Sequence, residues 1–318
     1  MHLLIVIVNY RTAELTIDCV RSVAEEMRTL PDARVVITDN ASPDDSAGRI
    51  EEALRQNDWP WATFVRLAIN GGFSYGNNAA IRPALAGNDP PKYVLLLNPD
   101  TVVRANAIHE LLAFLEANPK AGIAGSRLEE PDGTPQRSAF RFPTVLSELD
   151  GGLRFGPISK LLARWKIAPP PAEHNTATDW VAGASMIIRK EVFDAIGLLD
   201  ERYFMYFEEV DFCYRARRAG WRCWYVPSSR VVHLVGQASG VTDTKRPARR
   251  RPGYWFDSRR RFFTRNYNIA YAAAADAAWA IGFALWRLRR FLQQKPDNDP
   301  PRLLFDFIGH SVFMKGKT

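Results

Sequence analysis

A carboxylate that follows an apolar run gives the first chemical signal in this chain. Asp100 ends the segment Leu-Leu-Leu-Asn98-Pro-Asp100, so a predicted strand would deliver its side chain to the edge of a sheet. Hard divalent cations prefer oxygen ligands, and such an ion can bridge two phosphates. The pattern predicts a cation site at Asp100, although a plain Pro-Asp turn would have the same residues.

Three carboxylates open a predicted helix farther along the chain, at Glu208, Glu209 and Asp211. The positive end of the helix dipole favours anions, so we expect these groups to be ionised, as a general base must be. Acids in a first helical turn are also a routine stabilising device. Tyr206 and Phe207 precede them, however, and aromatic faces beside carboxylates are typical of a sugar pocket. The combination predicts a catalytic base beside such a pocket.

Two further polar residues stand at the ends of predicted strands. Asp39 could accept a hydrogen bond from the imide N–H of uracil or thymine, and either Asp39 or Ser42 could instead cap the next helix. His233 is one of five histidines. Its neutral imidazole could complete the coordination of a metal, and a satisfied core histidine is an equally weighted alternative.

Turn residues narrow the class of ligand at this edge. The first strand runs into Asn9-Tyr10-Arg11, where a dinucleotide-binding enzyme would have G-x-G-x-x-G, and no complete P-loop pattern is present. Asn70-Gly-Gly72 precedes a predicted helix and is either an ordinary turn or a place where a ligand approaches the backbone. Dehydrogenase chemistry and P-loop phosphoryl transfer are therefore disfavoured.

The elements that must position these residues alternate in type through the first third of the chain. Continuous apolar runs predict buried parallel strands, and the amphipathic segments between them predict helices. Strand–helix alternation indicates an α/β fold with a mostly parallel sheet, which binds ligands beyond the carboxyl ends of its strands. The predicted strands cover residues 3–8, 33–38, 63–67 and 93–97, and the predicted helices residues 15–27, 47–56 and 75–85.

The alternation stops near residue 125, and three parts are expected: a ligand-binding half over 1–125, a second half over 126–240 and a helical tail over 241–318. Residues 131–171 are rich in Pro and Gly and predict a loop-rich acceptor region. In the rest of the second half we expect strands over 180–189 and 222–226, and a helix over 208–219.

The net charge of +7 is concentrated in the tail. Residues 240–318 hold 16 Lys and Arg against 6 Asp and Glu, and residues 269–286 among them contain one charge, Asp276. An apolar stretch with basic flanks favours an interfacial helix on anionic lipid over nucleic acid, so we expect residues 255–295 to reach the inner membrane surface. A helix packed on the catalytic domain is a nearly equal alternative. Three scattered cysteines and the lack of a signal peptide favour a cytoplasmic location.

Taken together, these motifs resemble the family 2 glycosyltransferases, and within them the bacterial rhamnosyltransferase-like group. The matching blocks are residues 7–10, 39–42, 70–78, 97–100, 183–189 and 204–215. The resemblance implies a GT-A fold, in which Asp39 reads the base, Asp100 and His233 bind Mg²⁺ or Mn²⁺, and Glu209 deprotonates the acceptor with Glu208 beside it. It implies a donor site of Asn9, Tyr10, Arg11, Asp39, Asn70, Gly72, Asn98 and Asp100, and an acceptor or sugar pocket of Trp180, Gly183, Ala184, Tyr206, Phe207 and Asp211.

The implied reaction is an inverting transfer of rhamnose or a similar deoxyhexose from a dTDP- or UDP-sugar. The acceptor would be a hydroxyl of a cell-surface polysaccharide or lipid-linked glycan, at the cytoplasmic face of the membrane. Two positions depart from the pattern of the wider family. The metal motif has Asn98 where a carboxylate is usual, and the catalytic pair has Glu209 where aspartate is usual. The alternatives are a processive polysaccharide synthase, whose Q-x-x-R-W block is lacking here, and a catalytically silent nucleotide-sugar-binding scaffold on the membrane.

Overall fold

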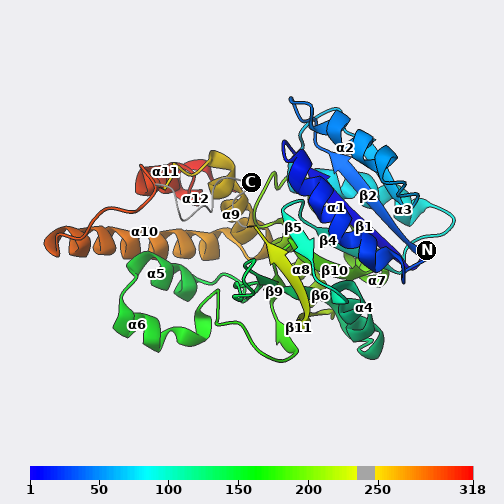
Figure 1. The fold of residues 1–318 in the computed structure, drawn as a ribbon. Coiled ribbons are helices and arrows are strands. Elements are labelled where there is room, and N and C mark those ends of the chain that lie inside the picture. Colours follow the sequence, from blue (N-terminus) through cyan, green and yellow to red (C-terminus); the bar gives the residue numbers. More distant parts are fainter. Residues whose placement is uncertain (235–247, 318) are drawn as a thin grey trace.

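The computed structural model describes residues 1–234 and 248–317 and has a nine-stranded sheet at its centre (Figure 1). The strand order is β3-β2-β1-β4-β10-β6-β11-β5, and β8 also pairs with β11. β1 to β4 are mutually parallel, as are β6 and β11, whereas β10, β5 and β8 run antiparallel to their neighbours. The bounds are β1 Leu3–Asn9, β2 Ala33–Asp39, β3 Ala62–Arg66, β4 Tyr93–Leu97, β5 Thr101–Val103, β6 Ala121–Glu129, β8 Thr176–Thr178, β10 Ser185–Arg189 and β11 Arg222–His233.

Helices cover both faces of the sheet, which explains why the central strands are apolar on both sides. In β1, Leu3, Ile5 and Ile7 join one core while Leu4, Val6 and Val8 join the other, and the whole strand is buried. The first core packs against α1 Ala13–Met27, α2 Ser46–Gln56 and α4 Ala107–Ala117. The second packs against α3 Gly72–Ala86, α7 Lys190–Ile196 and α8 Glu208–Arg218. The predicted α/β class is therefore confirmed.

The region expected to be loop-rich contains short helices. Residues 131–171 include α5 Val145–Leu153, α6 Gly156–Leu161 and a 3₁₀ turn at Ala163–Trp165. Thr144 caps α5, because its hydroxyl accepts a hydrogen bond from the backbone N–H of Ser147. Pro and Gly residues separate these helices. The composition therefore correctly predicted frequent turns, but it did not predict the short helices between the turns.

Two of the predicted strands have different bounds in the structure. Residues 180–189 form two strands of different sheets, because a turn at Gly183 separates β9 Trp180–Val181, which pairs with β7 Ala139–Phe140, from β10. The strand predicted over 222–226 continues to His233, since a register shift against β6 absorbs the residues between Val226 and Arg230. These differences arise from tertiary pairing, which the local pattern does not show.

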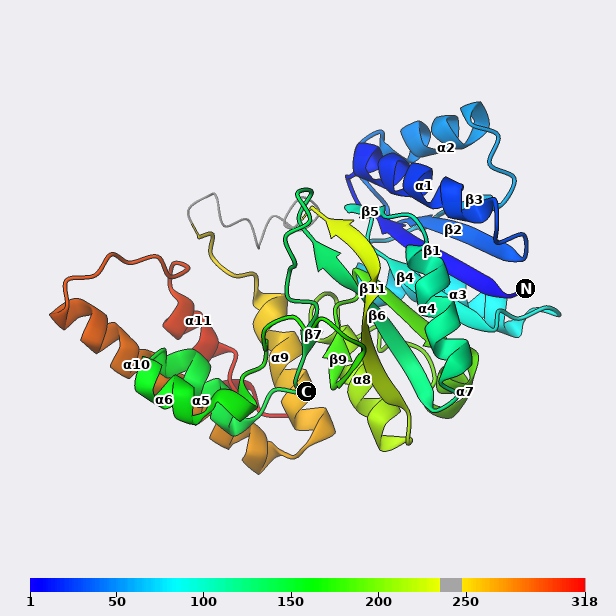
Figure 2. The same cartoon turned by 60° about the horizontal axis from the view of Figure 1, so that its bottom comes forward.

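The tail consists of four helices, α9 Gly253–Asn266, α10 Ile269–Leu292, α11 Leu303–Gly309 and α12 Val312–Lys315. α9 packs against α8 beside the sheet, whereas α10 lies along α5 and extends away from the sheet (Figures 1 and 2). Phe262 and Phe263 of α9 are wholly buried in the second core. The tail is therefore continuous with the domain's packing. The expected boundary at residue 240 lies outside the described residues.

The arginines that precede the apolar stretch of the tail, Arg259 to Arg261, are buried within the protein. Arg259, in α9, contacts Glu148 of α5 and Asp276 of α10, and all three are buried. Arg260 donates a hydrogen bond of 2.6 Å to the carbonyl oxygen of His310, and Arg261 pairs with an acid of the sheet domain. These three arginines are therefore engaged within the protein, while membrane contact by the tail as a whole stays a prediction.

Candidate active site

The structure brings together the two side chains expected to bind a metal. β5 pairs with β11 so that Thr101 faces His233, and this register places Nε2 of His233 at 3.5 Å from Oδ1 of Asp100. Asp100 is buried, and its Oδ1 has no hydrogen-bond partner within the described chain. A buried, unsatisfied carboxylate oxygen beside an imidazole nitrogen is a donor set that fits a divalent cation.

The turn that carries Asp100 is held firmly in place. The backbone N–H of Asn98 donates to the carbonyl oxygen of Ala184 at 3.0 Å, and the hydroxyl of Thr101 donates to the carbonyl oxygen of Asn98 at 2.7 Å. Within residues 1–234 and 248–317, no cluster of three or more His, Cys, Asp or Glu side chains is present. A bound ion would therefore take its other ligands from a diphosphate and water, as Mg²⁺ commonly does.

Asn9 and Asp39 form a buried hub at the ends of β1 and β2. The amide of Asn9 donates to Asp39 at 2.6 Å, and its oxygen accepts from Thr12 and Thr16. Ser42 contributes its hydroxyl and its backbone N–H to the same aspartate. Asn9 therefore supports the loop from within, whereas its neighbours Tyr10 and Arg11 are exposed at this edge of the sheet.

Asp39 does not cap a helix, because α2 begins only at Ser46. Its Oδ1 accepts two hydrogen bonds and its Oδ2 accepts one, from the backbone N–H of Ser42 at 2.9 Å. A carboxylate oxygen has room for about two donors. Oδ2 therefore retains acceptor capacity toward a base.

The backbone of a neighbouring loop lies very close to Gly72. Its φ is +86°, and a Cβ added there would lie 1.9 Å from the carbonyl oxygen of Phe204. The same oxygen accepts a hydrogen bond from the N–H of Phe73 at 2.9 Å. Gly72 thus lets the start of α3 pack closely on the loop of residues 200–207, and its expected place in a ligand site stays a prediction. Asn70 supports the turn by accepting from the N–H of Gly72 at 3.1 Å.

The loop of residues 200–207 enters α8 through two strained residues. Tyr206 and Phe207 both have a positive φ, of 69° and 68°, which is uncommon for aromatic residues. Such conformations persist only where surrounding contacts hold them, and they gather at functional sites. Here the rings of Tyr206 and Phe207 contact Tyr254 and Trp255 of α9. The aromatic run is therefore shared between the candidate pocket and the tail.

Burial dominates the electrostatics of the glutamate pair. It raises the pKa of Glu209 to about 7, and it raises the pKa of Glu208 well above its usual value, with the charge of Glu209 as a second cause. One oxygen of each carboxyl has no hydrogen-bond partner in the described part of the chain. The expectation that the helix dipole keeps both groups ionised is wrong, because desolvation outweighs it. A pKa near neutral pH nevertheless suits a general base.

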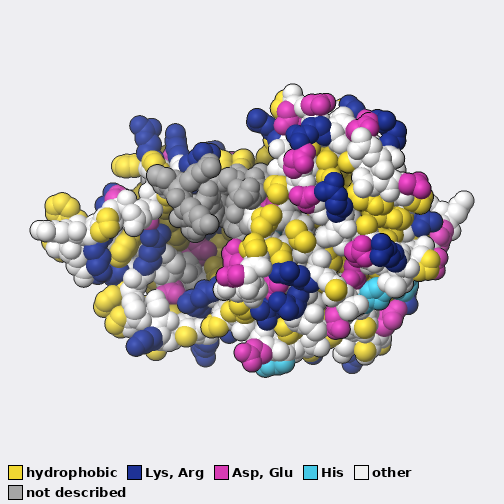
Figure 3. All heavy atoms as spheres, in the orientation of Figure 1, with side chains coloured by type: hydrophobic (Ala, Val, Ile, Leu, Met, Phe, Trp, Pro, Cys, Tyr) yellow, Lys and Arg dark blue, Asp and Glu magenta, His cyan; other side chains and the backbone are white. Residues whose placement is uncertain are grey.

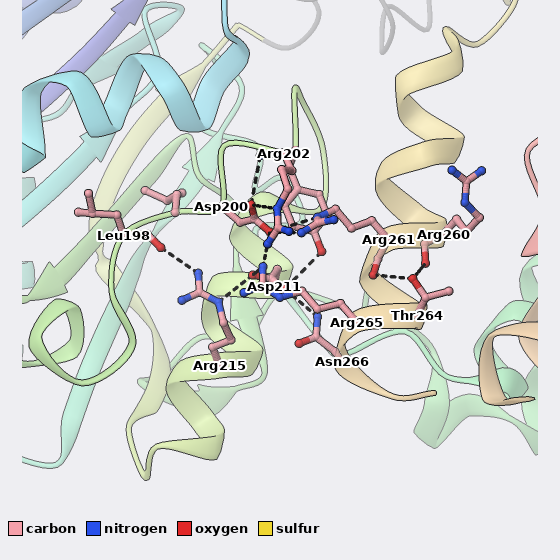
Figure 4. A network of polar contacts seen from close by, with 12 residues as sticks. Leu198, Asp200, Arg202, Asp211, Arg215, Arg260, Arg261, Thr264, Arg265 and Asn266 are labelled. Atoms are coloured by element: carbon pink, nitrogen blue, oxygen red, sulfur yellow. Dashed lines mark hydrogen bonds and ion pairs between the residues drawn. The ribbon is translucent and has the colours of Figure 1, made fainter. Parts of the chain in front are cut away.

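Asp211 holds α8 in place and has no exposed surface. It accepts hydrogen bonds from Arg215 at 2.8 Å, from Asn266 of α9 at 2.7 Å and from Tyr203 at 3.3 Å (Figure 4). Holding the helix fits this environment, and the expected contact of Asp211 with an acceptor stays a prediction.

Asp200 begins the same loop and is a functional candidate that sequence reasoning missed. It pairs with Arg202 of the loop and with Arg261 and Arg265 of α9 (Figure 4). These partners lower the pKa of Asp200 to about 2, although burial opposes them. The i, i+4 spacing of Arg261 and Arg265 could have shown that they share one helix face. Their partner on a distant loop could not be read from the sequence.

The remaining acceptor-pocket candidates are mostly engaged with protein. Trp180 stacks on Phe140 at 4.2 Å and donates its indole N–H to the carbonyl oxygen of Arg141. Ala184 is buried and supports the turn at Asn98. A Cβ at Gly183 would lie 3.3 Å from the ring of Phe73, so a small residue there keeps α3 close.

Comparison with known proteins places this chain among glycosyltransferases. The family described as glycosyltransferase like family 2 matches residues 2–255. An N-acetylglucosaminyl-diphospho-decaprenol L-rhamnosyltransferase of Mycobacterium tuberculosis is 29% identical over 218 residues, which are 65% of this chain and 68% of that protein. The rhamnosyltransferase WbbL of Escherichia coli is 30% identical over 170 residues, or 52% of this chain and 61% of that protein.

Among solved structures, GalNAc-T7 with UDP, GalNAc and Mn²⁺ superposes with a TM-score of 0.62 at 16% identity. The match covers 92% of this chain, which spans about half, 54%, of that protein. Similarity at this level of identity concerns the fold, and the expected GT-A fold is confirmed.

Proposed function

The chain belongs to the glycosyltransferase like family 2, and from this premise we propose that it is an inverting rhamnosyltransferase that uses a dTDP- or UDP-activated donor. The observation that carries the proposal is Glu209: its pKa is raised to about 7, and one carboxyl oxygen has no hydrogen-bond partner among the described residues, which suits a base that must accept one proton near neutral pH. Family membership supports sugar transfer itself, and the names of the two relatives above support rhamnose as the sugar.

In the proposed reaction, Glu209 accepts the proton of an acceptor hydroxyl. The oxygen of that hydroxyl forms a bond to the anomeric carbon as the bond from this carbon to the diphosphate breaks on the opposite side, which inverts the configuration. Adjacent helical residues point about 100° apart, so Glu208 and Glu209 cannot both face one hydroxyl. We assign the base to Glu209 and a supporting role in binding to Glu208.

Asp100 and His233 would hold a divalent cation against the diphosphate. When bound, the ion would supply positive charge that offsets the charge of the departing diphosphate. The Mn²⁺ in the GalNAc-T7 structure supports this assignment for the fold. Oδ2 of Asp39 would accept the imide N–H of the base, which thymine and uracil both offer.

The acceptor is proposed to be a lipid-linked glycan, because the name of the mycobacterial relative contains such an acceptor. The place of reaction would then be the cytoplasmic face of a membrane, where such lipids present their head groups. Neither alternative function considered from the sequence has an observation of its own that favours it over this one.

The decisive experiment measures sugar transfer from dTDP-L-rhamnose or UDP-sugars to a lipid-linked N-acetylglucosamine diphosphate. The anomeric configuration of the product is then determined. We expect inversion, and Glu209→Gln should lower kcat by about a hundredfold or more with little change in donor affinity. Glu208→Gln should act mainly through binding. Glu191→Gln is the matched control, because Glu191 lies exposed in the first turn of α7. Retention of configuration, or a fully active Glu209→Gln variant beside an inactive Glu208→Gln variant, would contradict the assignment.

A further inference from the structure

The outer face of α10 carries an apolar stripe that no part of the described chain covers. Ile281, Leu285, Leu288 and Leu292 are 58%, 49%, 56% and 71% exposed. Their spacing of four, three and four residues places them within an arc of about 60° on the helix surface. Isolated exposed apolar residues are ordinary, but four branched side chains aligned on one face are not.

The stripe lies opposite the face that α10 uses for packing. Phe283 is buried, and Gly282 lies against the backbone of α5, with a Cβ built there 2.9 Å from the carbonyl oxygen of Leu149. The helix is thus already anchored on its inner side. The outer leucines contribute little to that packing, and another role must account for them.

Further exposed apolar side chains lie on the helices packed against α10. Phe291 extends the end of α10 itself, and Phe305, Phe313 and Met314 lie on α11 and α12 with exposed fractions of 63% to 78%. Figure 3 shows hydrophobic and basic side chains interspersed over this end of the molecule, where Figure 1 places α10 and α11. The combination is typical of surfaces that meet lipid head groups.

The charged residues around the stripe indicate which partner it binds. The acids that follow α10 in the chain, Asp297, Asp299 and Asp306, are all paired with arginines of the protein. Lys295, three residues beyond Leu292, is exposed and forms no ion pair within the described residues, and Arg302 is exposed just before α11. Exposed cations in the segment that follows the leucine stripe complement an anionic bilayer.

We propose that the stripe formed by Ile281, Leu285, Leu288 and Leu292 is a membrane-docking surface that lies in the head-group region of an anionic bilayer. This inference rests on the proposed function, which places the reaction at a membrane. Vesicle binding, however, can be measured without any sugar acceptor or donor. Failure of this inference is therefore distinguishable from failure of the proposed reaction.

α10 docks on the bilayer and does not cross it. By length and composition it is the one helix among the described residues that could span a membrane, but a third of its apolar window is buried inside the protein. Crossing would separate α10 from α5 and leave Asp276 without its partner Arg259. Exposing that buried pair to lipid would be costly, so the packed state is retained with only one face in the lipid.

Docking also fixes how the active site meets the membrane. α10 follows α9 after two residues, and Asp276 ties the two helices through Arg259. α9 in turn contacts the loop of residues 200–207, because the hydroxyl of Ser258 donates to the carbonyl oxygen of Met205 at 3.1 Å. The surface and the catalytic loop therefore belong to one packed unit.

The test is flotation of the full chain with phosphatidylglycerol–phosphatidylcholine vesicles and with pure phosphatidylcholine vesicles. We expect binding to the anionic vesicles, and Leu285→Glu/Leu288→Glu should reduce the partition coefficient by roughly tenfold or more. Ile69→Glu is the matched control, since Ile69 is 59% exposed and lies far along the chain from the tail. Circular dichroism and thermal melting should be alike for the variants, which excludes misfolding.

Two outcomes would overturn the inference. One is equal flotation of the wild-type and the double-glutamate protein, which would place the lipid contact elsewhere. The other is a stable dimer in gel filtration that the two substitutions dissociate, with no vesicle binding by either form, because the stripe would then meet a second copy. Lys295→Glu/Arg302→Glu provides an independent measure: it should weaken binding to anionic vesicles and lose that effect at high salt.

Discussion

Replacing Glu209 by glutamine is expected to stabilise the folded protein above neutral pH and to lower kcat by about a hundredfold or more. Burial raises the pKa of this carboxyl from 4.5 to about 7, so the folded protein holds a proton that the unfolded chain has released. Below about pH 4.5 both states hold the proton, and this group does not reduce the free energy of unfolding. That free energy then falls as the pH rises from about 4.5 through about 7. Glutamine has the same shape and no charge, so it avoids this loss.

The expected size of the effect follows from the pKa. A rise from 4.5 to about 7 corresponds to about 3 kcal/mol, at about 1.4 kcal/mol for each tenfold change in the acid constant. This is an upper limit, because Glu209 is only partly buried and part of its charge is screened by solvent. In a domain of this size, 1 kcal/mol moves the melting temperature by roughly 2–4 °C.

The assay is chemical denaturation of the wild type and of Glu209→Gln between about pH 5 and pH 8.5, paired with rate measurements on the same samples. The two proteins should have nearly equal free energies of unfolding at the acid end and should diverge as the pH rises. Glu191→Gln should follow the wild type throughout. A Glu209→Gln variant that gains no stability at the alkaline end would refute the argument that burial sets the pKa of this base.

Three further outcomes follow from the structure. Asp100→Asn should weaken Mn²⁺ binding measured by calorimetry about tenfold or more and lower transfer, and unchanged binding would remove Asp100 from the cation site. Gly72→Ala should lower the free energy of unfolding by roughly 3 kcal/mol, because its Cβ meets the carbonyl oxygen of Phe204, and a wild-type melting curve would show that the loop relaxes freely. Arg259→Met should cost about 3–5 kcal/mol by leaving Glu148 and Asp276 buried without a partner; a loss under about 1 kcal/mol would mean that they are solvated.

Much of the first half of the fold could be predicted from the sequence. Parallel strands buried on both faces need continuous apolar runs, and the runs at 3–8, 33–38 and 93–97 match β1, β2 and β4 to within a residue. The strand ends then located Asp39 and Asp100 at the ligand edge, because the carboxyl ends of parallel strands share one edge. The split of residues 180–189 and the extension of β11 could not be predicted, since the pairing partner decides both.

The sequence by itself determined which residues could do chemistry, because residue type and local order set what a side chain can donate, accept or bind. Only the tertiary structure decided which of them are free to do so. Asp211 and Glu209 lie in one helical turn, yet Arg215 and Asn266 engage the first, while one oxygen of the second has no hydrogen-bond partner in the described part of the chain. Likewise, Arg259 and Arg261 have the composition of a lipid-binding cluster, but they pair with buried acids, and the uncharged leucines of α10 remain exposed in their place. Burial and pairing depend on segments distant in the chain, and no local pattern contains that information.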